Sequence, residues 1–539
     1  MIVYRSHQQD TSPDACFSRM RGILGVLETG SADHDRAVEL LVEFGELEAG
    51  VADAVCPKED SDGLIVRAFR QAGLLAARVL CLSWEGRMAE AGEHIEKLKR
   101  GLDALASLGL PETIRVSVPE GYAFSSLYPE MYLEAASRFF RAVRPKSVVC
   151  IGIRSIGTSL SSAVCARLEQ FGCDTHSYTV RPHGHPFDRY IALSPMLENE
   201  LRGLGGSHFL VIDEGPGLSG SSLCCVARKL SEIGIPDERI VFFPSWEPDG
   251  SAFKSESARE RWGRHARYST SFEDVWLDES RSDRLFPPGE LTDVSAGRWR
   301  TILFEGPGPR PAVHPHHERR KYLCADPSGK GRVLFKFAGL GRYGRAAFER
   351  SGRLAEKGFS PPVLGLSNGF LRMAFVEGRP VFAVEADRAL LDAMADYLSY
   401  LEKNFSSEKQ GASDDELARM IRANVREGLG EYWERKLENL EEFMAPLAYG
   451  RPVAMDGRML PHEWLRTPSG RYVKTDGADH HCDHFYPGCQ DIAWDIAGCC
   501  VEFSLDRKRQ DYFVERFAAL SKDGALSERI VFHTLAYLA

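Results

Sequence analysis

The chain has 539 residues, of which 43% are hydrophobic and 27% charged, so it is long enough for two to four folded domains. Its formal net charge of −10 argues against a nucleic-acid partner, because proteins that bind the nucleic-acid backbone usually carry a basic excess. No apolar run reaches roughly eighteen residues, so we expect no membrane span, and the N-terminus lacks the apolar core of a signal peptide. The 13 scattered cysteines are typical of reduced thiols in a cytoplasmic protein.

Residues 1–110 are predicted to form a helical N-terminal domain. Apolar residues recur there at three- and four-residue spacings, in two sets: Val38, Leu41, Leu47, Val51 and Val55, then Ile95, Leu98, Leu102 and Leu105. Between the two sets lies a segment apolar enough for a buried helix, GLIVRAFRQAGLLAARVLCLSW. No cluster of chemically reactive residues stands out in this region, which favours a structural or partner-binding role.

Residues 111–285 contain short apolar runs that alternate with helical periods. The runs SVVCIGI, THSYTV, HFLVID and RIVFFPS are typical of buried strands, and the segments LSSAVCARLEQFG and GSSLCCVARKLSEIG of helices that end at glycine. This alternation predicts an α/β domain with a parallel sheet and right-handed crossovers. Ligands of such sheets bind at the carboxyl ends of the strands, so the segments that follow these runs are the candidate site.

The segment HFLVIDEGPGLSGSSL, at 208–223, carries the strongest chemical signal. Its apolar strand ends in Asp213 and Glu214, which can accept hydrogen bonds from the two hydroxyls of a ribose. A glycine- and serine-rich loop follows and then a helix begins, an arrangement whose backbone N–H groups cradle a phosphate. The residues that suit this cradle are Gly217, Ser219, Gly220, Ser221 and Ser222. Together the two features suit a ribose 5-phosphate.

This segment resembles the motif with which type I phosphoribosyltransferases bind phosphoribosyl pyrophosphate (PRPP): a hydrophobic strand, two acids, a spacer and Thr-Gly-x-Thr/Ser. Asp213 and Glu214 match the acids, and Ser219, Gly220 and Ser222 match the end of the motif. The spacer GPGL is one residue longer than in the family. The alternative interpretation is a strand-turn-helix corner that needs glycine and serine only for its turn.

The resemblance extends to two further loops. After the first strand, where the family binds pyrophosphate, this sequence has Arg154, Ser155, Gly157, Thr158 and Ser159. After the next strand, where the family has a basic mobile loop, Arg181 and Arg189 would assist the departure of pyrophosphate; the alternative is an exposed polar loop. The resemblance implies displacement of pyrophosphate from PRPP by a small-molecule acceptor, with Mg²⁺ and catalysis by Asp213, Glu214, Arg181 and Arg189.

Residues 286–320 have the Pro, Gly and His content of a linker, and 321–539 follow as a second phosphate-handling unit. The segment RKYLCADPSGKGRVLFKFAGL predicts a β-hairpin with Lys336 on its second strand, and a helix with Glu349 comes next. This order resembles aminoglycoside-phosphotransferase-like kinases, an α+β fold. The resemblance implies that Lys336 grips the phosphates of ATP, that Glu349 pairs with this lysine, and that Ala374–Glu377 faces the adenine, with Glu377 as part of the site.

The catalytic segment departs from the kinase family. In the register of DGRMLPHEWL, Glu463 replaces the metal-binding Asn, Asp476 is the metal aspartate, and Arg458 stands at the position of the catalytic base. Because an arginine cannot accept a proton at neutral pH, the unit is either a pseudokinase or uses another acid, such as Asp456 or Asp479. The resemblance assigns Mg²⁺ to Glu463 and Asp476. In the run that follows, Asp476 with Asp479 or Asp483 would bind Mg²⁺ beside the nucleotide phosphates, or the run is a polar loop. A zinc site among His480, His481, Cys482, Asp483, His484 and Cys489 is a further alternative, although the spacing matches no closed zinc pattern.

The sequence as a whole is identified as a fusion of three parts: a helical N-terminal region, a phosphoribosyltransferase-like domain at 111–285 and a kinase-like domain at 321–539. The leading hypothesis is a cytoplasmic protein that transfers ribose phosphate and then phosphate to one small molecule. The alternatives are a PRPP or nucleotide sensor with a pseudokinase domain, and a hydrolase on the transferase fold. Small molecules are the expected partners, and a homodimer is compatible with the sequence.

Overall fold

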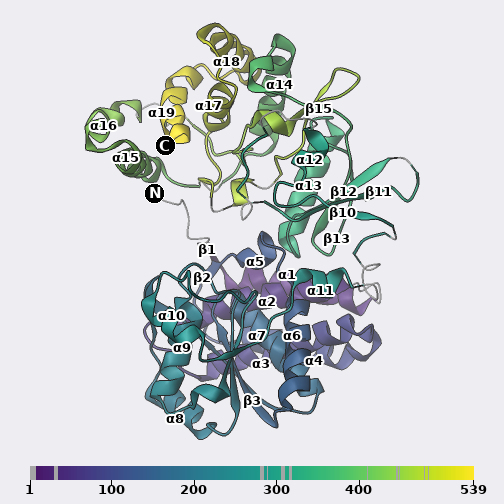
Figure 1. Cartoon of the computed structure of the whole chain (residues 1–539), viewed down its shortest axis with the longest axis vertical. Coiled ribbons are helices and arrows are strands. Elements are labelled where there is room, and N and C mark those ends of the chain that lie inside the picture. Colours follow the sequence, from purple (N-terminus) through teal and green to yellow (C-terminus); the bar gives the residue numbers. More distant parts are fainter. Residues whose placement is uncertain are drawn as a thin grey trace.

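The chain folds into two bodies, which Figure 1 shows one above the other. The lower body holds the N-terminal helices and a parallel sheet, and the upper body holds an antiparallel sheet and a group of helices. The computed structural model describes residues 8–29, 34–278, 285–287, 289–304, 310–314, 318–329, 331–408, 411–444, 447, 450–478, 480–483 and 485–539. The fold is therefore mixed α/β, as the alternation of apolar patterns predicts.

Helices form most of the N-terminal region, as the three- and four-residue periodicity predicts. They are α1 (Pro13–Glu28), α2 (His34–Val55), α3 (Leu64–Trp84) and α4 (Gly92–Ala106). Their apolar faces meet around Phe17, Phe44 and Phe69, which are fully buried. The strand β1 (Gln8–Thr11) pairs antiparallel with β2 (Ile114–Ser117) at the end of this region.

The middle region is built around a parallel sheet with the strand order β4-β3-β7-β8-β9. Its strands are β3 (Ser147–Ile153), β4 (Asp174–Val180), β7 (His208–Ile212), β8 (Ile240–Phe243) and β9 (Ala266–Arg267). The helices between and around them are α5 (Glu120–Ala123), α6 (Pro129–Val143), α7 (Ile156–Gln170), α8 (Pro195–Gly203), α9 (Ser221–Glu232), α10 (Glu256–Trp262) and α11 (Phe272–Trp276). A hairpin of β5 (Pro182–His185) and β6 (Asp188–Ile191) follows β4. The predicted strands of the sheet are thus confirmed.

The N-terminal helices and the parallel sheet share one hydrophobic core. Helix α7 packs against α2, α3 and α6 on one side and against β3 and β4 on the other. Leu80 of α3, Leu160 of α7 and Val148 of β3 belong to the same set of buried side chains. Residues 1–110 therefore do not have a core separate from that of the sheet, and the lower body is one packed unit.

The sheet of the upper body is antiparallel, with the strand order β10-β11-β12-β14-β13. Its strands are β10 (Leu291–Asp293), β11 (Lys321–Ala325), β12 (Arg332–Phe337), β13 (Val363–Ser367) and β14 (Phe370–Ala374). Helix α12 (Arg300–Leu303) follows β10, and α13 (Arg342–Glu356) follows β12. The predicted hairpin of β11 and β12 is confirmed. The segment expected as a linker instead supplies β10, the edge strand of this sheet.

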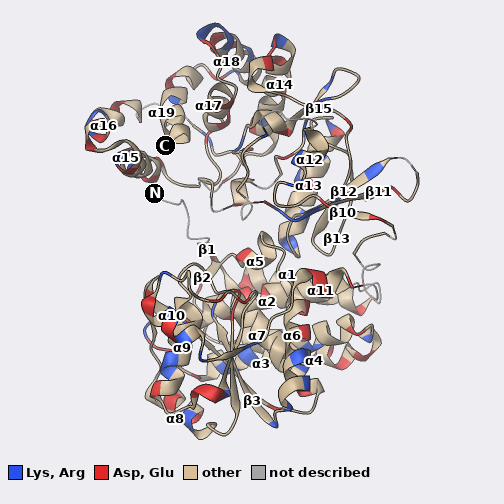
Figure 2. Cartoon of the chain, viewed as in Figure 1, with Lys and Arg blue, Asp and Glu red and all other residues tan. Residues whose placement is uncertain are grey.

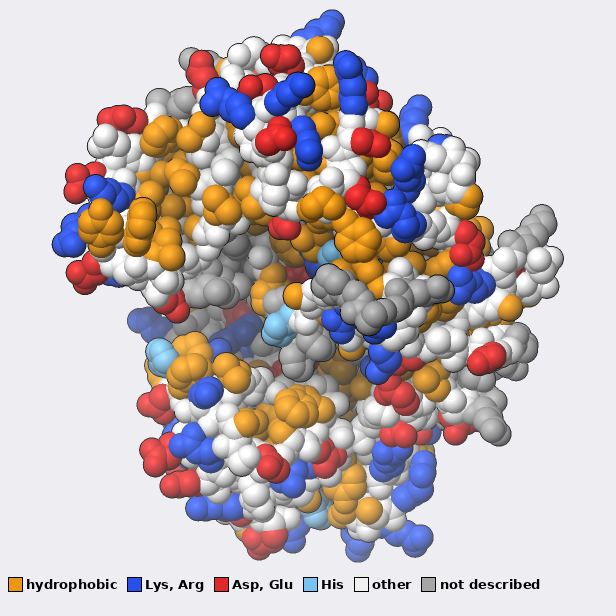
Figure 3. Space-filling view, turned by 45° about the horizontal axis from the view of Figure 1, so that its top comes forward, with side chains coloured by type: hydrophobic (Ala, Val, Ile, Leu, Met, Phe, Trp, Pro, Cys, Tyr) orange, Lys and Arg blue, Asp and Glu red, His pale blue; other side chains and the backbone are white. Residues whose placement is uncertain are grey.

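The rest of the upper body, here named the helical lobe, contains a small sheet and a group of helices. The helices are α14 (Arg388–Asn404), α15 (Asp414–Leu429), α16 (Glu431–Arg435), α17 (Ala493–Glu502), α18 (Arg507–Ser521) and α19 (Leu526–Leu538). The small sheet joins β15 (Arg379–Pro380), β16 (Trp464–Arg466) and β17 (Tyr472–Lys474). Hydrophobic side chains gather over α15 and α16, at the left of the upper body (Figure 3), where Leu429, Tyr432 and Trp433 are more than half exposed.

Ion pairs join the two bodies between α2 and the first turn of α13. Arg342 of α13 contacts both Glu43 and Glu46 of α2, and Arg345 contacts Glu39. The hydroxyl of Tyr343 donates to Glu46 at 2.9 Å. These glutamates are spaced four and three residues apart and so lie on one face of α2. Since Glu39, Glu43 and Glu46 are at most 7% exposed, the contact is a buried part of the structure.

Charged residues of both signs are spread over the two bodies in the view of Figure 2. Within the described parts of the chain, no helix is both long enough and apolar enough to cross a bilayer.

Candidate functional site

The structure brings the first two predicted loops of the middle region together. Strands β3 and β7 are neighbours, so the loop that follows β3 and the acids that follow β7 lie at the same edge of the sheet. The contact is close: a Cβ atom on Gly157 would lie 2.6 Å from the carbonyl oxygen of Ile212. Glycine is therefore required at position 157 for the loop to pack against the end of β7.

Asp213 and Glu214, here named the acid pair, are partly buried at this edge. Burial raises the pKa of Asp213 to about 6, against the lowering effect of backbone N–H groups and of Arg181. Burial, Glu120 and Asp213 raise the pKa of Glu214 to about 8. The backbone N–H of Gly121 donates to Glu214 Oε2 at 3.2 Å. An acid pair of this kind takes up protons near neutral pH, which is typical of functional sites.

The glycine- and serine-rich segment forms the turn into α9. Gly220 has φ +67° and lies against the ring of Phe253, which leaves no room for a side chain. The hydroxyl of Ser221 donates to the carbonyl of Pro186 at 2.6 Å, and its backbone N–H donates to Ser219 Oγ at 3.2 Å. Gly217 is exposed and Ser222 partly exposed. The segment thus fits both interpretations, the phosphate cradle and the turn.

The basic residues of the predicted pyrophosphate loops are paired with acids of the N-terminal region. Arg154, whose side chain is 2% exposed, contacts Asp60 and, through Nε, Asp53 Oδ1 at 3.3 Å. The Nε of Arg181 lies 3.0 Å from Asp53 Oδ1, and its backbone N–H donates to Asp60 Oδ2 at 2.8 Å. A pyrophosphate could bind the two guanidinium groups only if it displaced these carboxylates.

The remaining residues predicted for this site lie before α7, within α7 or on β6. Ser155, with φ +112°, precedes α7. Thr158 and Ser159 are buried within α7, where Ser159 Oγ lies 3.0 Å from the hydroxyl of Tyr122. Arg189, on β6, lines a different cavity, beside α9 and α10. The structure therefore places Gly157 against Asp213, and Arg181 and Arg189 lie near enough to Asp213 to lower its pKa. Thr158 and Ser159 are instead buried within α7.

A second candidate site lies in the upper body, in a cleft between the antiparallel sheet and the helical lobe. The side chains of Leu323, Leu334, Met373 and Leu465 line its apolar part. The backbone segment 374–376, which follows β14, lines the same space. Lys321, Lys336 and Arg458 line its polar part together with Glu318, Glu463 and Asp476. The cleft thus combines an apolar space with a charged end, as nucleotide sites do.

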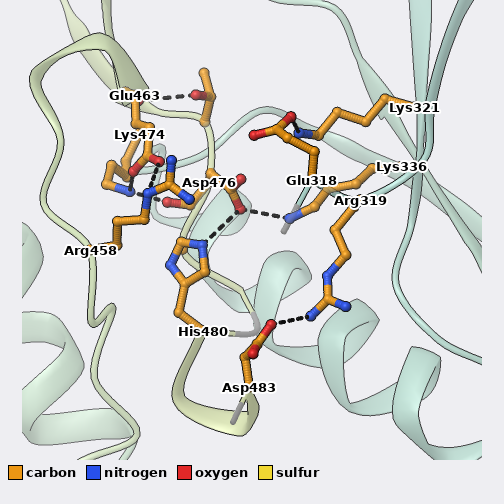
Figure 4. Close-up of polar contacts among 12 residues, drawn as sticks. Glu318, Arg319, Lys321, Lys336, Arg458, Glu463, Lys474, Asp476, His480 and Asp483 are labelled. Atoms are coloured by element: carbon orange, nitrogen blue, oxygen red, sulfur yellow. Dashed lines mark hydrogen bonds and ion pairs between the residues drawn. The ribbon is translucent and has the colours of Figure 1, made fainter. Parts of the chain in front are cut away.

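Lys336 and Asp476 meet at the charged end of the cleft. Lys336 comes from β12 and Asp476 from the segment after β17, and Figure 4 shows the two side chains pointing toward one another. The distance from Lys336 Nζ to Asp476 Oδ1 is 2.6 Å. Lys336 and the other cations near Asp476 hold the pKa of that carboxyl well below its usual range, although burial acts in the opposite direction. Two residues that are 140 positions apart in the sequence are thus in contact.

The predicted partner of Lys336 is wrong. Glu349 is exposed on α13, and the acid in contact with Lys336 is Asp476. The face of α13 that packs inward carries Gly344, Ala347, Arg350, Ser351 and Leu354, at the spacing of a helical face. Glu349 lies outside that face, because successive residues turn by about 100° around the axis. The buried charge of α13 is Arg350, which donates to the carbonyls of Gly477 and Met455.

Glu377 also lies outside the charged part of the cleft. Its side chain is 69% exposed and pairs with Arg332 at 2.9 Å. The backbone that lines the apolar part of the cleft is the preceding segment, 374–376. Residues 374–376 of the stretch that is expected to face the adenine thus line the cleft, whereas Glu377 does not.

The segment predicted as catalytic forms a buried network of charges. Glu463 accepts from Lys474 Nζ at 2.9 Å, and its other oxygen lies 3.1 Å from Arg458 Nε. Asp456 accepts from the hydroxyl of Tyr397 at 2.6 Å and lies 3.1 Å from Lys474 Nζ. Asp495 accepts backbone N–H groups of Asp456 and Gly457, both at 2.8 Å. Arg458 is thus held by Glu463 at the predicted position of the base.

The residues assigned to a metal do not fit a divalent cation. Both oxygens of Glu463 contact a cation of the chain itself, and Asp476 contacts Lys336. Among the described residues, no group of three or more His, Cys, Asp and Glu side chains could hold a metal ion, so the zinc alternative gains no support either. Asp479, the alternative catalytic base, and His484, a candidate zinc ligand, lie outside the described residues.

Sequence reasoning missed three residues that shape these sites. Lys474 stands two positions before Asp476 in the strand YVK, and a lysine within a buried strand is a signal that could have been noticed. Asp53 and Asp60 belong to the N-terminal region, about 100 residues before the loops that they contact. No local pattern predicts such a long-range pairing.

Comparison with known proteins gives only distant similarities. No protein-family model and no curated protein matches this chain. The choline kinase LicA from Streptococcus pneumoniae is 14% identical, with a TM-score of 0.30 over 44% of this chain and 82% of its own. A choline/ethanolamine kinase family protein from Mesorhizobium loti is 14% identical, with a TM-score of 0.33 over 48% and 81%. The ethanolamine kinase of Plasmodium vivax is 11% identical, with a TM-score of 0.31 over 60% and 87%. Similarity at this level assigns no activity to the chain, whose function must rest on its own residues.

Proposed function

We propose that the upper body binds a purine nucleotide such as ATP in the cleft between the antiparallel sheet and the helical lobe. One observation carries this proposal: an apolar space at the sheet ends in the Lys336–Asp476 pair, with Nζ and Oδ1 2.6 Å apart. An adenine ring needs an apolar slot with backbone polar groups at its edge, and the phosphates need fixed cations. The cleft offers both within one space.

Each group of the nucleotide has matching residues. Leu323, Leu334 and Leu465 would enclose the base, and the backbone of segment 374–376 would offer hydrogen-bonding groups at its edge. Lys336 and Arg458, which line the charged end, would contact the phosphates. Binding of this kind supports phosphoryl transfer to a small-molecule acceptor as the activity of the upper body, because such transfer depends mainly on positioning and on charge stabilisation.

The catalytic segment favours nucleotide binding without base-assisted transfer as the second candidate. Arg458 stands where the resemblance to kinases expects the base, and an arginine cannot accept a proton at neutral pH. Asp456 is fully buried, and its carboxylate is engaged by Tyr397 and Lys474. A domain that senses nucleotide without rapid turnover would have this arrangement.

Calorimetric titration with ATP and ADP tests the proposal. The wild-type protein is expected to bind at micromolar concentrations, and Lys336→Met is expected to weaken binding about tenfold or more, since a charge-assisted contact to phosphate is lost. Lys357→Met, which removes an exposed lysine at the end of α13, is the matched control and should bind like the wild type. Wild-type protein that releases no heat with either nucleotide would refute the proposal. Release of ADP in the presence of candidate acceptors separates transfer from binding alone.

For the lower body we propose that the acid pair and the loop after β3 bind PRPP or a related ribose phosphate. The proposal is supported by the adjacency of these segments at one sheet edge and by the raised pKa values of both acids. A thermal-shift titration with PRPP tests it: PRPP should raise the melting temperature of the wild type, and Asp213→Asn with Glu214→Gln should abolish this effect. Release of pyrophosphate by the wild type would identify a transferase. Binding without release would identify a sensor.

A further inference from the structure

We propose that the upper body binds its nucleotide without a divalent cation, because the ammonium groups of Lys474 and Lys336 contact the oxygens of Glu463 and Asp476 that a metal ion would need. This inference rests on the proposed function and concerns how the phosphates are neutralised. The contacts of Lys474, Glu463 and Asp476 carry it (Figure 4).

Lys474 is enclosed by acids. Its side chain is 1% exposed, and its Nζ lies 2.9 Å from Glu463 Oε2 and 3.1 Å from Asp456 Oδ2. The same ammonium donates to the backbone carbonyl of Asp476. A divalent cation in such a site would be surrounded by carboxylate and carbonyl oxygens, which are the very groups that contact the ammonium here. Lys474 therefore has the ligand set of a bound cation.

The neighbouring cations complete the neutralisation. Arg458 Nε lies 3.1 Å from Glu463 Oε1, and Lys336 Nζ lies 2.6 Å from Asp476 Oδ1. The carboxylates of Asp456, Glu463 and Asp476 thus face the cations Lys336, Arg458 and Lys474. The ring of His480 also lies 3.6 Å from Asp456 Oδ1 and 3.8 Å from Asp476 Oδ1. A divalent ion would add two positive charges beside these cations, and displacement of Lys474 would remove the lysine that pairs with the buried Asp456.

The groups that line the cleft then meet the phosphates directly. Lys321, Lys336 and Arg458 line the polar part of the cleft, whereas Lys474 lines the adjoining space behind it. Because Lys474 neutralises the carboxylate of Glu463, Arg458 can donate its remaining N–H groups to an anion. Protein cations replace the metal as the partner of the nucleotide phosphates.

The deciding measurement is the affinity of the wild-type protein for ATP in excess EDTA and in millimolar MgCl₂. The two dissociation constants are expected to agree within about threefold. ATP that binds about tenfold or more tightly with Mg²⁺ would overturn the inference and leave the proposed function standing. Absence of ATP binding in both buffers would overturn the proposed function and the inference with it.

Two variants test whether Lys474 makes ATP binding independent of Mg²⁺. In Lys474→Met, Asp456 loses its lysine and Glu463 keeps Arg458 as its remaining countercharge, so ATP binding is expected to become at least about tenfold dependent on Mg²⁺. The double variant Lys474→Met with Glu463→Gln removes the ammonium together with one acid, and is expected to restore a ratio close to that of the wild type. A double variant as dependent on Mg²⁺ as the single one would show that Lys474 does not act by neutralising Glu463. Lys508→Met, on the exposed face of α18, is the control for loss of a lysine.

Discussion

The sheet edge of the lower body and the cleft of the upper body each contain charged candidate ligand-binding residues. In both places these residues form ion pairs with other residues of the same chain. At the sheet edge, the cations Arg154 and Arg181 are paired with Asp53 and Asp60. In the cleft, the acid Glu463 is paired with Lys474 and Arg458. At the sheet edge, carboxylates pair with the arginines that would bind an anionic ligand. In the cleft, cations pair with the carboxylate that would bind a metal ion.

The difference between the two regions lies in where the pairing residues come from. Lys474 is eleven positions from Glu463, and both belong to the same small region of the helical lobe. Asp53 and Asp60 belong to α2 and to the segment after it, so their contact with the loops depends on how the N-terminal helices pack on the sheet. Asp53 is also one-third exposed, whereas Lys474 is almost fully buried. We therefore expect the charges of the cleft to be permanent and those of the sheet edge to be open to exchange with a ligand.

The largest expected effect is on the free energy of unfolding, when the ion pairs of Lys474 in the cleft are removed. Lys474→Met removes the lysine that pairs with the buried Asp456 and leaves Glu463 with Arg458 as its remaining countercharge, so it should lower the free energy of unfolding by about 3–5 kcal/mol. The midpoint of urea unfolding measures this loss. The control Lys508→Met should change the free energy by no more than about 0.5 kcal/mol. Equal stability of the two variants would mean that the pairing in the cleft is no stronger than a surface contact.

A smaller effect, dependent on pH, is expected at the sheet edge. The pKa of Glu214 rises from an ordinary 4.5 to about 8 in the folded protein, so the folded state binds a proton that the unfolded chain has released. The contribution of this proton to the free energy of unfolding is fully present below pH 4.5 and is lost as the pH rises through about 8. Glu214→Gln should therefore melt like the wild type near pH 4.5 and roughly 2–6 °C higher at about pH 9. An equal difference at both pH values would contradict the raised pKa.

The smallest effect tests whether the pairing at the sheet edge can open. Asp53→Asn removes a carboxylate that contacts both Arg154 and Arg181. Because Asp53 is partly exposed, the loss is worth about 1 kcal/mol, and pyrophosphate should bind about fivefold more tightly. Competition with PRPP in a fluorescence titration measures the change. Glu59→Gln removes a nearby exposed acid and should leave the affinity unchanged. Unchanged or weaker binding by Asp53→Asn would show that these arginines do not receive the anion.

Local patterns in the sequence predict the elements that hold the sites. The apolar runs at 147–153 and 208–213 form neighbouring strands, because continuous apolar runs are typical of strands that are buried on both faces. The segments that follow them contain Gly157, in the first turn of α7, and Gly220, before α9, and a Cβ atom added at either position would lie less than 3.0 Å from a neighbouring atom. The resemblance to kinases implies that Lys336 and Asp476 belong to one site, and the two residues are in contact.

The partners of these residues could not be predicted in the same way. A helix follows the strand of Lys336, which made Glu349 the expected partner, but the orientation of that helix is decided by Ala347, Arg350 and Leu354, which pack inward. The pairing of Arg154 with Asp60 depends on tertiary packing between distant segments. The role of Lys474 required knowledge that its strand is buried beside two acids. Periodicity predicts elements, whereas charge pairing depends on their packing.

The most direct test of nucleotide binding in the upper body uses the methyl groups of the 11 methionines as reporters in NMR spectra. Met373 lines the cleft, whereas Met131 is buried in α6 of the lower body, next to Tyr132, whose hydroxyl donates to the backbone carbonyl of Asp213. Addition of ATP is expected to shift the signal of Met373, identified by the variant Met373→Leu, and to leave that of Met131 in place. A shift of Met131 with no change at Met373 would contradict the account, because it would place the nucleotide in the lower body.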